Sequence, residues 1–351
     1  MAYTVIDKAT DHFKTVLYTG THSSVPTITV GFKSDFLWMK SRTQTYDHNV
    51  LDTTRGGSSK IFPNKTDKQS TTGDSVTFNA TTFQPSGQAI NESGQGTNNM
   101  VSWSWKANGG TTASNSSGSI TSTVQANTAA GISIVKYDGT GSNATVGHGL
   151  GVAPAAIIVK NYTRTAAQSW IVAHQRHPSG FNDASFLDLQ NAKDTDSGYW
   201  NNTSPTSTVF SIGTNAKCNG NGDIHIAYCF AQKQGFSKFS SYIGNGSTDG
   251  QFIYLGFKPA WVMIKNVEQS KNWYIFDNKR LGFNPNKQIG IQANDTTAEV
   301  DGSSEYIDLL SNGFKLRENF SHTNSDGFRY IYFAFADSPF TSSAGVPTTA
   351  F

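Results

Sequence analysis

The chain has 351 residues and a formal net charge of +2, and 15% of its residues are charged and 12% aromatic. The aromatic content excludes a disordered chain, which would combine few aromatic residues with a high net charge. The charges are scattered without a basic run, which argues against a nucleic-acid partner. No stretch reaches the roughly 18 apolar residues of a membrane span, so membrane insertion is not expected.

The N-terminus lacks the basic region and apolar run of a secretory signal peptide. We therefore expect synthesis in a cytoplasm. The two cysteines, Cys218 and Cys229, are too few for a disulfide framework and are expected to be reduced.

The first predicted strands lie between residues 31 and 105. Residues 31–40 read GFKSDFLWMK, a segment that begins at a Gly, ends at a Lys and carries an apolar run just before the Lys. A second apolar segment follows at 49–52. At 101–105, large apolar residues alternate strictly with serines. This period of two predicts a strand that lies between a packed core and a close neighbour.

Residues 111–130 follow this first group of strands. They are rich in Gly, Ser, Thr and Asn. Such a composition predicts a linker or an exposed loop.

The same pattern then returns twice. Residues 151–160 read GVAPAAIIVK and residues 256–265 read GFKPAWVMIK, each again from a Gly to a Lys. Each copy has a second apolar segment and a closing strand of period two. In the register of the closing strands, Cys229 falls where Ser104 and Ala334 fall, so it is expected to be a small core residue. Self-similarity of this kind marks repeats of one structural unit.

The repeats divide the chain into related β modules at 1–110, 131–233 and 235–340, followed by a C-terminal arm at 341–351. Helical periodicity is weak, and strand-like segments with frequent NG, DG and GG turns dominate. A module of roughly 105 residues has the size of one β-sandwich or jelly roll. We predict an all-β protein with three tandem, related, jelly-roll-like β-sandwich modules.

Five runs of the sequence carry a family resemblance. They are GSITSTVQANTAA, GISIVKYDGTGSNATVGHGLGVAPAAIIVK, GFSKFSSYIGNGSTDGQFIYLGFKPAWVMIK, LSNGFKLR and the ending GVPTTA. With them, essentially the whole chain resembles a family of uncharacterised virion or tail-associated structural proteins of marine tailed bacteriophages. The resemblance implies a role in the virion. It implies neither an activity nor a position in the particle.

No pattern predicts a catalytic residue, a metal site or a cofactor. His174 and His177 lack the further ligand that a zinc site requires and are expected in a surface loop. The Asp-Gly and Asn-Gly clusters do not match a calcium loop. Asp52 and Asp277 occupy matching positions in two repeats, which favours structural caps over the carboxylate pair of a glycosidase. We therefore expect a protein that is not an enzyme.

Carbohydrate binding is the function that the residues favour. Most tryptophans belong to the strand motifs and are expected in the core, but Trp200 lies in a polar loop beside Tyr199, Asn201 and Asn202. An exposed Tyr-Trp pair next to two amides predicts a glycan platform. The alternative is that Trp200 folds back as a lid on the second module.

Two further features bear on assembly. Lys40, Lys160 and Lys265 match by the internal repeat, and we expect each to end a buried strand with its ammonium group in solvent. The C-terminal arm carries Val346 and Phe351, which could add to the sheet of a neighbouring subunit or fill its groove. A frayed end is the alternative.

These features predict a virion structural protein, a tail-fibre or tail-associated component that contacts glycans of the host surface. Its expected partners are other virion proteins, copies of itself in a homo-oligomer and a host glycan, with multivalency strengthening weak contacts. A capsid decoration or cement protein, with its termini as arms, is the alternative. A glycan depolymerase is the weaker alternative. The host, the receptor and the oligomeric state stay open.

Overall fold

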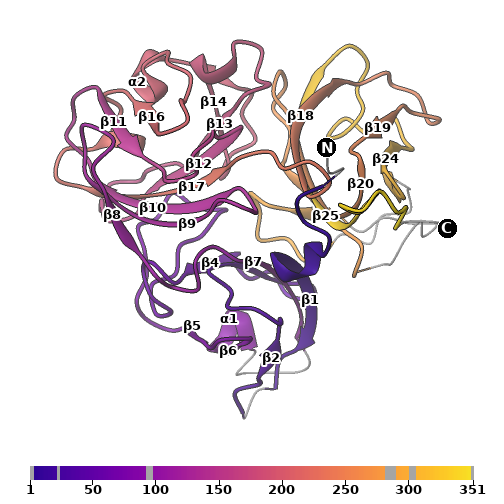
Figure 1. Cartoon of the computed structure of the whole chain (residues 1–351), viewed down its shortest axis with the longest axis horizontal. Helices are drawn as coiled ribbons and strands as arrows, with labels where there is room; N and C mark the ends of the chain where they lie inside the picture. The colour runs from indigo at the N-terminus through magenta and orange to yellow at the C-terminus, as the bar shows by residue number, and fades with distance from the viewer. Residues whose placement is uncertain (1–3, 22–23, 92–97, 281–289, 300–305, 349–351) are drawn as a thin grey trace.

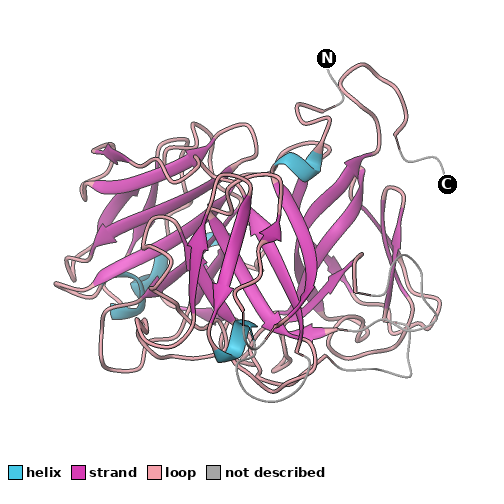
Figure 2. Ribbon diagram, turned by 90° about the horizontal axis from the view of Figure 1, so that it is seen from below, coloured by secondary structure: helices cyan, strands magenta, loops and turns pink. Residues whose placement is uncertain are grey.

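The computed structural model of the chain describes residues 4–21, 24–91, 98–280, 290–299 and 306–348. It confirms an all-β protein, because antiparallel sheets account for nearly all regular structure and the helices are single turns. Figures 1 and 2 show the arrangement of the strands. We refer below to residues 1–110, 131–233 and 235–340 as the first, second and third repeat.

The first repeat has a main sheet in the order β1-β7-β3-β4 and a small sheet in the order β2-β6-β5. Its elements are η1 (Ala9–Asp11), β1 (Phe13–Thr19), β2 (Ile28–Thr29), β3 (Phe36–Ser41), β4 (Asn49–Asp52), β5 (Ser75–Phe78), β6 (Thr82–Ser86), α1 (Gln88–Asn91) and β7 (Asn99–Trp105).

The second repeat contributes most of an eight-stranded sheet in the order β15-β14-β13-β12-β17-β10-β9-β8, and β11 pairs with β16 in a small sheet. The elements here are β8 (Ala113–Asn115), β9 (Ser122–Asn127), β10 (Ile132–Asp138), β11 (Ala144–Gly147), β12 (Ala156–Asn161), β13 (Ile171–His174), η2 (Gly180–Asn182), β14 (Asp183–Phe186), β15 (Asp194–Thr195), α2 (Ser197–Trp200), β16 (Val209–Ile212), α3 (Ala216–Asn219) and β17 (Ile224–Phe230).

The third repeat has a main sheet in the order β18-β25-β20-β21-β22 and a small sheet in the order β19-β24-β23. Its elements are β18 (Ser237–Ile243), β19 (Phe252–Tyr254), β20 (Phe257–Asn266), β21 (Tyr274–Asp277), β22 (Ile291–Gln292), β23 (Ile307–Leu310), β24 (Gly313–Leu316) and β25 (Arg329–Pro339).

One strand order recurs in the three main sheets: β1-β7-β3-β4, β10-β17-β12-β13 and β18-β25-β20-β21. The glycine that opens each repeated motif has a positive φ, 101° at Gly31, 72° at Gly151 and 83° at Gly256. Residues with a side chain rarely adopt this left-handed backbone conformation. Glycine is therefore favoured at the turn that precedes each strand with the repeated lysine.

Residues 111–130 are not the linker or loop that their composition predicts. They contain β8 and β9, and β9 pairs antiparallel with β10. The reason is the buried amide of Gln125 in β9, whose Oε1 accepts from the main-chain N of Gly110 (2.9 Å) and whose Nε2 donates to Thr54 (3.0 Å). These tertiary hydrogen bonds outweigh a loop-like composition.

The three main sheets surround a common core (Figure 1). The large residues of the closing strands meet there. In the second repeat, the smaller alternating residues Ala227 and Cys229 belong instead to a separate outer core. Two contacts between repeats illustrate the packing: Phe36 stacks on Tyr228 at 4.2 Å between ring centroids, and Trp105 meets Trp261 edge-on at 5.6 Å. Cys229 is buried and free, as its register predicts. The repeats therefore close on one another and do not form an extended row.

Buried lysines join each repeat to a neighbour. Lys40, Lys160 and Lys265 are each 0% exposed, and each ammonium donates to a main-chain carbonyl of another repeat. The pairs are Lys40 with Thr296 (3.1 Å), Lys160 with Thr66 (2.9 Å) and Lys265 with Gln190 (2.9 Å). Each ammonium also donates to at least one carbonyl of its own repeat. The prediction that these ammonium groups reach solvent is wrong.

A ring nitrogen of each repeat makes a second bond to the same neighbouring repeat. Its acceptor is the main-chain carbonyl four residues before the carbonyl that accepts from the lysine. The pairs are His48 with the carbonyl of Gln292 (3.0 Å), Trp170 with Phe62 (2.8 Å) and Trp273 with Phe186 (2.8 Å). Trp38 donates to Nδ1 of His48 at 2.9 Å, so Nε2 of this histidine carries the hydrogen. The first repeat thus reaches the third, the second reaches the first and the third reaches the second, which closes a cycle.

Both terminal segments lie at one end of the molecule (Figure 2). Thr4 donates to the carbonyl of Gln234 (3.0 Å), and the Asp7 carboxylate accepts from the main-chain N and the hydroxyl of Ser343 (2.6 Å each). Residues 341–348 turn back through a bridge between Thr341 and Pro347, so this part of the predicted arm is not extended. Its Val346 is exposed, and Phe351 lies outside the described residues.

Among the described residues, no helix is long and apolar enough to span a membrane.

Candidate binding groove between the second and third repeats

The predicted glycan platform is not exposed. Tyr199 and Trp200 lie in α2 with side chains 4% and 1% exposed, packed in the outer core of the second repeat. The side chain of Asp196 caps the start of this turn, and Asn201 ends it with a φ of 50°. Asn202, also at positive φ, follows it on the surface. The prediction of an exposed Tyr-Trp pair is wrong, and the alternative, in which Trp200 folds back on the second module, is the arrangement that the structure has.

The histidines of the HxxH pair are buried, so the predicted surface loop is also wrong. Nε2 of His174 meets the carbonyl of Tyr332 at 3.3 Å, and Nε2 of His177 meets the hydroxyl of Ser185 at 2.9 Å. Burial lowers the pKa of His177 to about 3, which keeps this imidazole neutral. Within the described ranges, no group of three or more His, Cys, Asp or Glu side chains could hold a metal ion.

Asp52 and Asp277 form buried ion pairs with arginines three residues later. Asp52 accepts from Arg55 at 2.6 Å, and Asp277 accepts from Arg280 at 2.7 Å. Each carboxylate also accepts from another repeat: Asp52 from the Tyr228 hydroxyl (2.7 Å) and Asp277 from Nε1 of Trp103 (3.1 Å). Their contacts are therefore those of structural groups that join repeats.

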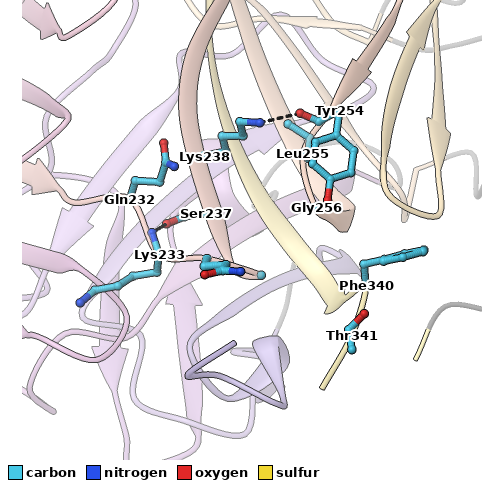
Figure 3. Close-up of a pocket in the computed structure, with 11 residues that line it drawn as sticks. Gln232, Lys233, Ser237, Lys238, Tyr254, Leu255, Gly256, Phe340 and Thr341 are labelled. Carbon is cyan, nitrogen blue, oxygen red and sulfur yellow. Dashed lines mark hydrogen bonds between the residues drawn. The ribbon is translucent and has the colours of Figure 1, made fainter. Parts of the chain in front are cut away.

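Exposed aromatic side chains occur instead on the third repeat, at a pocket of about 290 Å³ (Figure 3). Tyr254 in β19 is 56% exposed, and Phe340 after β25 is 37% exposed. The alternation along β19 buries Ile253 and turns Tyr254 outward. Phe340 and Thr341 border the pocket on the side of the C-terminal segment.

Lys238 of β18 holds Tyr254 in place. Its Nζ donates to the main-chain carbonyl of Tyr254 at 2.7 Å and lies 5.2 Å from the centre of the ring. Partial burial lowers the pKa of Lys238. At Gly256, a Cβ atom would lie 3.3 Å from the Tyr254 hydroxyl, so the absence of a side chain lets the ring lie close to the main chain.

A second pocket of about 400 Å³ adjoins the first and shares Gln232 and Lys233 with it. Gln175 and Arg176 of the second repeat line its other side. We call the combined surface the junction groove. Its principal side chains are Gln175, Arg176, Gln232, Lys233, Lys238, Tyr254 and Phe340.

A fixed turn forms the floor of the groove. Lys233 and Ser237 bond through main-chain atoms (Ser237 N to Lys233 O, 2.9 Å), and the Ser237 hydroxyl accepts from Lys233 N at 3.1 Å. Gly235 lies between them with a φ of 75°, against the N-terminal Thr4. The connection between the repeats therefore presents its side chains from an ordered main chain.

The groove combines an aromatic face with amides, hydroxyls and cations. Among the described residues that line the two pockets, no Asp or Glu occurs. The groove therefore lacks the two carboxyl groups, about 5 to 9.5 Å apart, that glycoside hydrolysis requires. It can stack on a ring and donate several hydrogen bonds at once.

Sequence reasoning missed this groove, although one signal was present. Tyr254 departs from the internal repeat, since Thr29 and Gly149 stand at the matching positions. An aromatic residue that only one repeat carries is not required by the shared architecture.

No curated protein sequence matches the chain. The pattern of one family, described as a domain of unknown function (DUF7483), matches residues 8–339. The match includes all three repeats and most of the junction groove. The chain therefore belongs to the DUF7483 family.

Proposed function

We propose that the chain is a structural protein of a tailed-bacteriophage virion, a tail-fibre or tail-associated component that contacts host-surface glycans through the junction groove. The observation that carries the glycan contact is the exposed Tyr254 ring, held by Lys238 beside the amides of the groove. The family resemblance of the sequence supports the virion role.

The chemistry of the groove suits a saccharide. A sugar ring offers apolar C–H faces to an aromatic ring and hydroxyl groups to amides and ammonium groups. The pocket volumes of about 290 and 400 Å³ lie near the lower end of the roughly 300–1,000 Å³ typical of small-molecule sites. Single sugar units of a longer chain therefore fit better than a folded partner.

The scaffold supports weak contact by many copies. The cyclic lysine bonds fix the third repeat against the second, so the two sides of the groove keep their spacing. Several identical grooves in a homo-oligomer would raise a weak affinity through effective concentration.

The glycan contact is tested by binding to polysaccharides of candidate hosts, with Tyr254→Ala as the variant. Loss of one stacking ring, worth about 0.5–1.5 kcal/mol, should weaken binding up to roughly tenfold. Phe252→Ala is the matched control, because Phe252 is exposed on the same strand outside the two pockets. No binding to any host polysaccharide, or equal losses in both variants, would contradict the proposal.

The position in the particle is tested by antibody-gold labelling of intact virions. Label at the tail supports the proposed role. Label over the head favours the alternative of a capsid decoration protein, and the terminal segments joined by Asp7 and Ser343 would then be the first residues to alter.

A further inference from the structure

The junction groove carries positive charge from three side chains. Arg176 comes from the second repeat, Lys233 from the connection and Lys238 from β18. Within the part of the chain that the structure describes, none of the three forms a salt bridge. Because the whole chain has a net charge of only +2, this cluster is a local feature.

We infer that the groove recognises an acidic polysaccharide, one that carries carboxylate or sulfate groups along its chain. The inference rests on the proposed glycan contact and adds the ligand class. Hydrogen bonds between a cation and an anionic oxygen are roughly twice as strong as neutral ones. A neutral glycan would leave the three cations unpaired.

The placement of Lys238 favours a saccharide over other anions. Its ammonium lies 5.2 Å from the centre of the Tyr254 ring, and one of its three hydrogens is used on the Tyr254 carbonyl. A sugar ring stacked on Tyr254 would bring an acidic substituent to the remaining hydrogens. Gln232 and Gln234, both exposed, would meet the hydroxyl groups.

Arg176 and Lys233 lie in the adjoining pocket. The planar guanidinium of Arg176 can bind a carboxylate or sulfate through two parallel hydrogen bonds. A polymer that follows the groove from Tyr254 past Lys233 to Arg176 would pair more than one acidic group. The ligand is therefore a chain of acidic sugars and not a single sugar at a chain end.

The test measures binding of the whole protein to a polyuronate, to dextran sulfate and to neutral dextran, at low and high salt. We expect binding to one or both acidic polymers and none to dextran. Salt should weaken that binding, because dissolved ions screen the attraction between exposed charges. The polyuronate and sulfate arms identify which acidic group is preferred.

The variants Arg176→Gln, Lys233→Gln and Lys238→Gln should each weaken binding to the acidic polymer about three- to tenfold. Lys217→Gln is the matched control, because Lys217 also lies near a tyrosine ring (6.0 Å from the centre of Tyr199) but outside the groove. Its binding should equal that of the unaltered protein.

The outcomes separate the two proposals. Equal binding to dextran, unchanged by the three variants, would overturn the acidic ligand and keep the glycan contact. No binding to any of these polymers or to host polysaccharide would overturn both. Binding to poly-glutamate as tight as to the acidic polysaccharides, with the same variant losses, would assign the groove to an acidic peptide.

Discussion

The ammonium nitrogen of Lys160 lies 2.9 Å from the carbonyl oxygen of Thr66 and joins the second repeat to the first. Lys40 makes the matching bond to the third repeat, and Lys265 makes it to the second. The buried lysine of each repeat thus donates a hydrogen bond to one neighbouring repeat, and main-chain carbonyls of the same repeat accept from the lysine of the other neighbour. This cycle holds the main sheets around their common aromatic core.

Lys160→Met should destabilise the protein by about 1–3 kcal/mol, the cost of one buried carbonyl left without a donor. The carbonyl of Gln168 would lose the ammonium, whereas the carbonyl of Thr66 would keep the main-chain N of Gln168 (3.0 Å) as a donor. Urea unfolding measures the difference, with Lys136→Met as the control, because Lys136 is the half-buried lysine of β10. A loss no greater than that of the control would mean that the bonds contribute little.

The stability of the protein should rise with pH in the mildly alkaline range. Burial lowers the pKa of Lys265 to about 7, whereas an unfolded lysine has a pKa of about 10.4. Above pH 7 the unfolded chain therefore binds more protons than the native protein, and the free energy of unfolding increases by up to about 1.4 kcal/mol per pH unit for this group. As pH falls through about 7, that contribution is lost.

Urea unfolding at pH 7.0 and 9.0 checks this dependence. Lys40 and Lys160, with pKa values lowered by burial to about 8, act in the same direction over a narrower range. Lys265→Met should flatten the rise with pH relative to the unaltered protein. An unchanged slope would show that Lys265 keeps an ordinary pKa in the folded state.

Trp200→Ala should cost about 3–5 kcal/mol of folding free energy, the usual range for removing a large buried aromatic side chain. Its side chain is buried in the outer core of the second repeat, away from the junction groove. Glycan binding by the fraction that stays folded should therefore be unchanged. A variant of normal thermal stability that no longer binds would restore the exposed platform predicted from the sequence.

Removing one partner of a buried ion pair should lower the free energy of unfolding more than replacing both partners with apolar residues. Arg280→Met leaves the Asp277 carboxylate without its cation and should cost about 3–5 kcal/mol. The double variant Asp277→Leu with Arg280→Met removes both charges and should recover part of that loss. Denaturant unfolding of the single and double variants gives the comparison. A double variant that is less stable than Arg280→Met would argue that Trp103, which donates to Asp277, depends on the carboxylate.

The sequence predicted the features that are local. Alternation of large and small residues marks the closing strands, and the repeated Gly-to-Lys motifs mark the strands β3, β12 and β20. The small core position of Cys229 also follows from strand register. Each of these depends on residues that are neighbours along the chain.

The features that sequence reasoning missed depend on residues far apart. The acceptor that joins Lys160 to the first repeat, the carbonyl of Thr66, lies 94 residues away along the chain, so the residues around the lysine do not indicate this contact. Tyr254 and Phe340 meet in one groove only after β25 has returned to the sheet. Trp200 was misplaced because its polar neighbours form helix caps and not an exposed loop.

The cyclic bonds also set the copy number of the repeat. An open solenoid can gain or lose a unit, because each unit contacts only the next and the ends are capped. Here the three repeats are joined in a closed cycle. A fourth repeat, or the loss of one, would change the angle between neighbouring repeats and separate each lysine from its acceptor carbonyl. A chain with one repeat duplicated or deleted should therefore fail to fold, whereas a change in the length of a surface loop within one repeat should be tolerated.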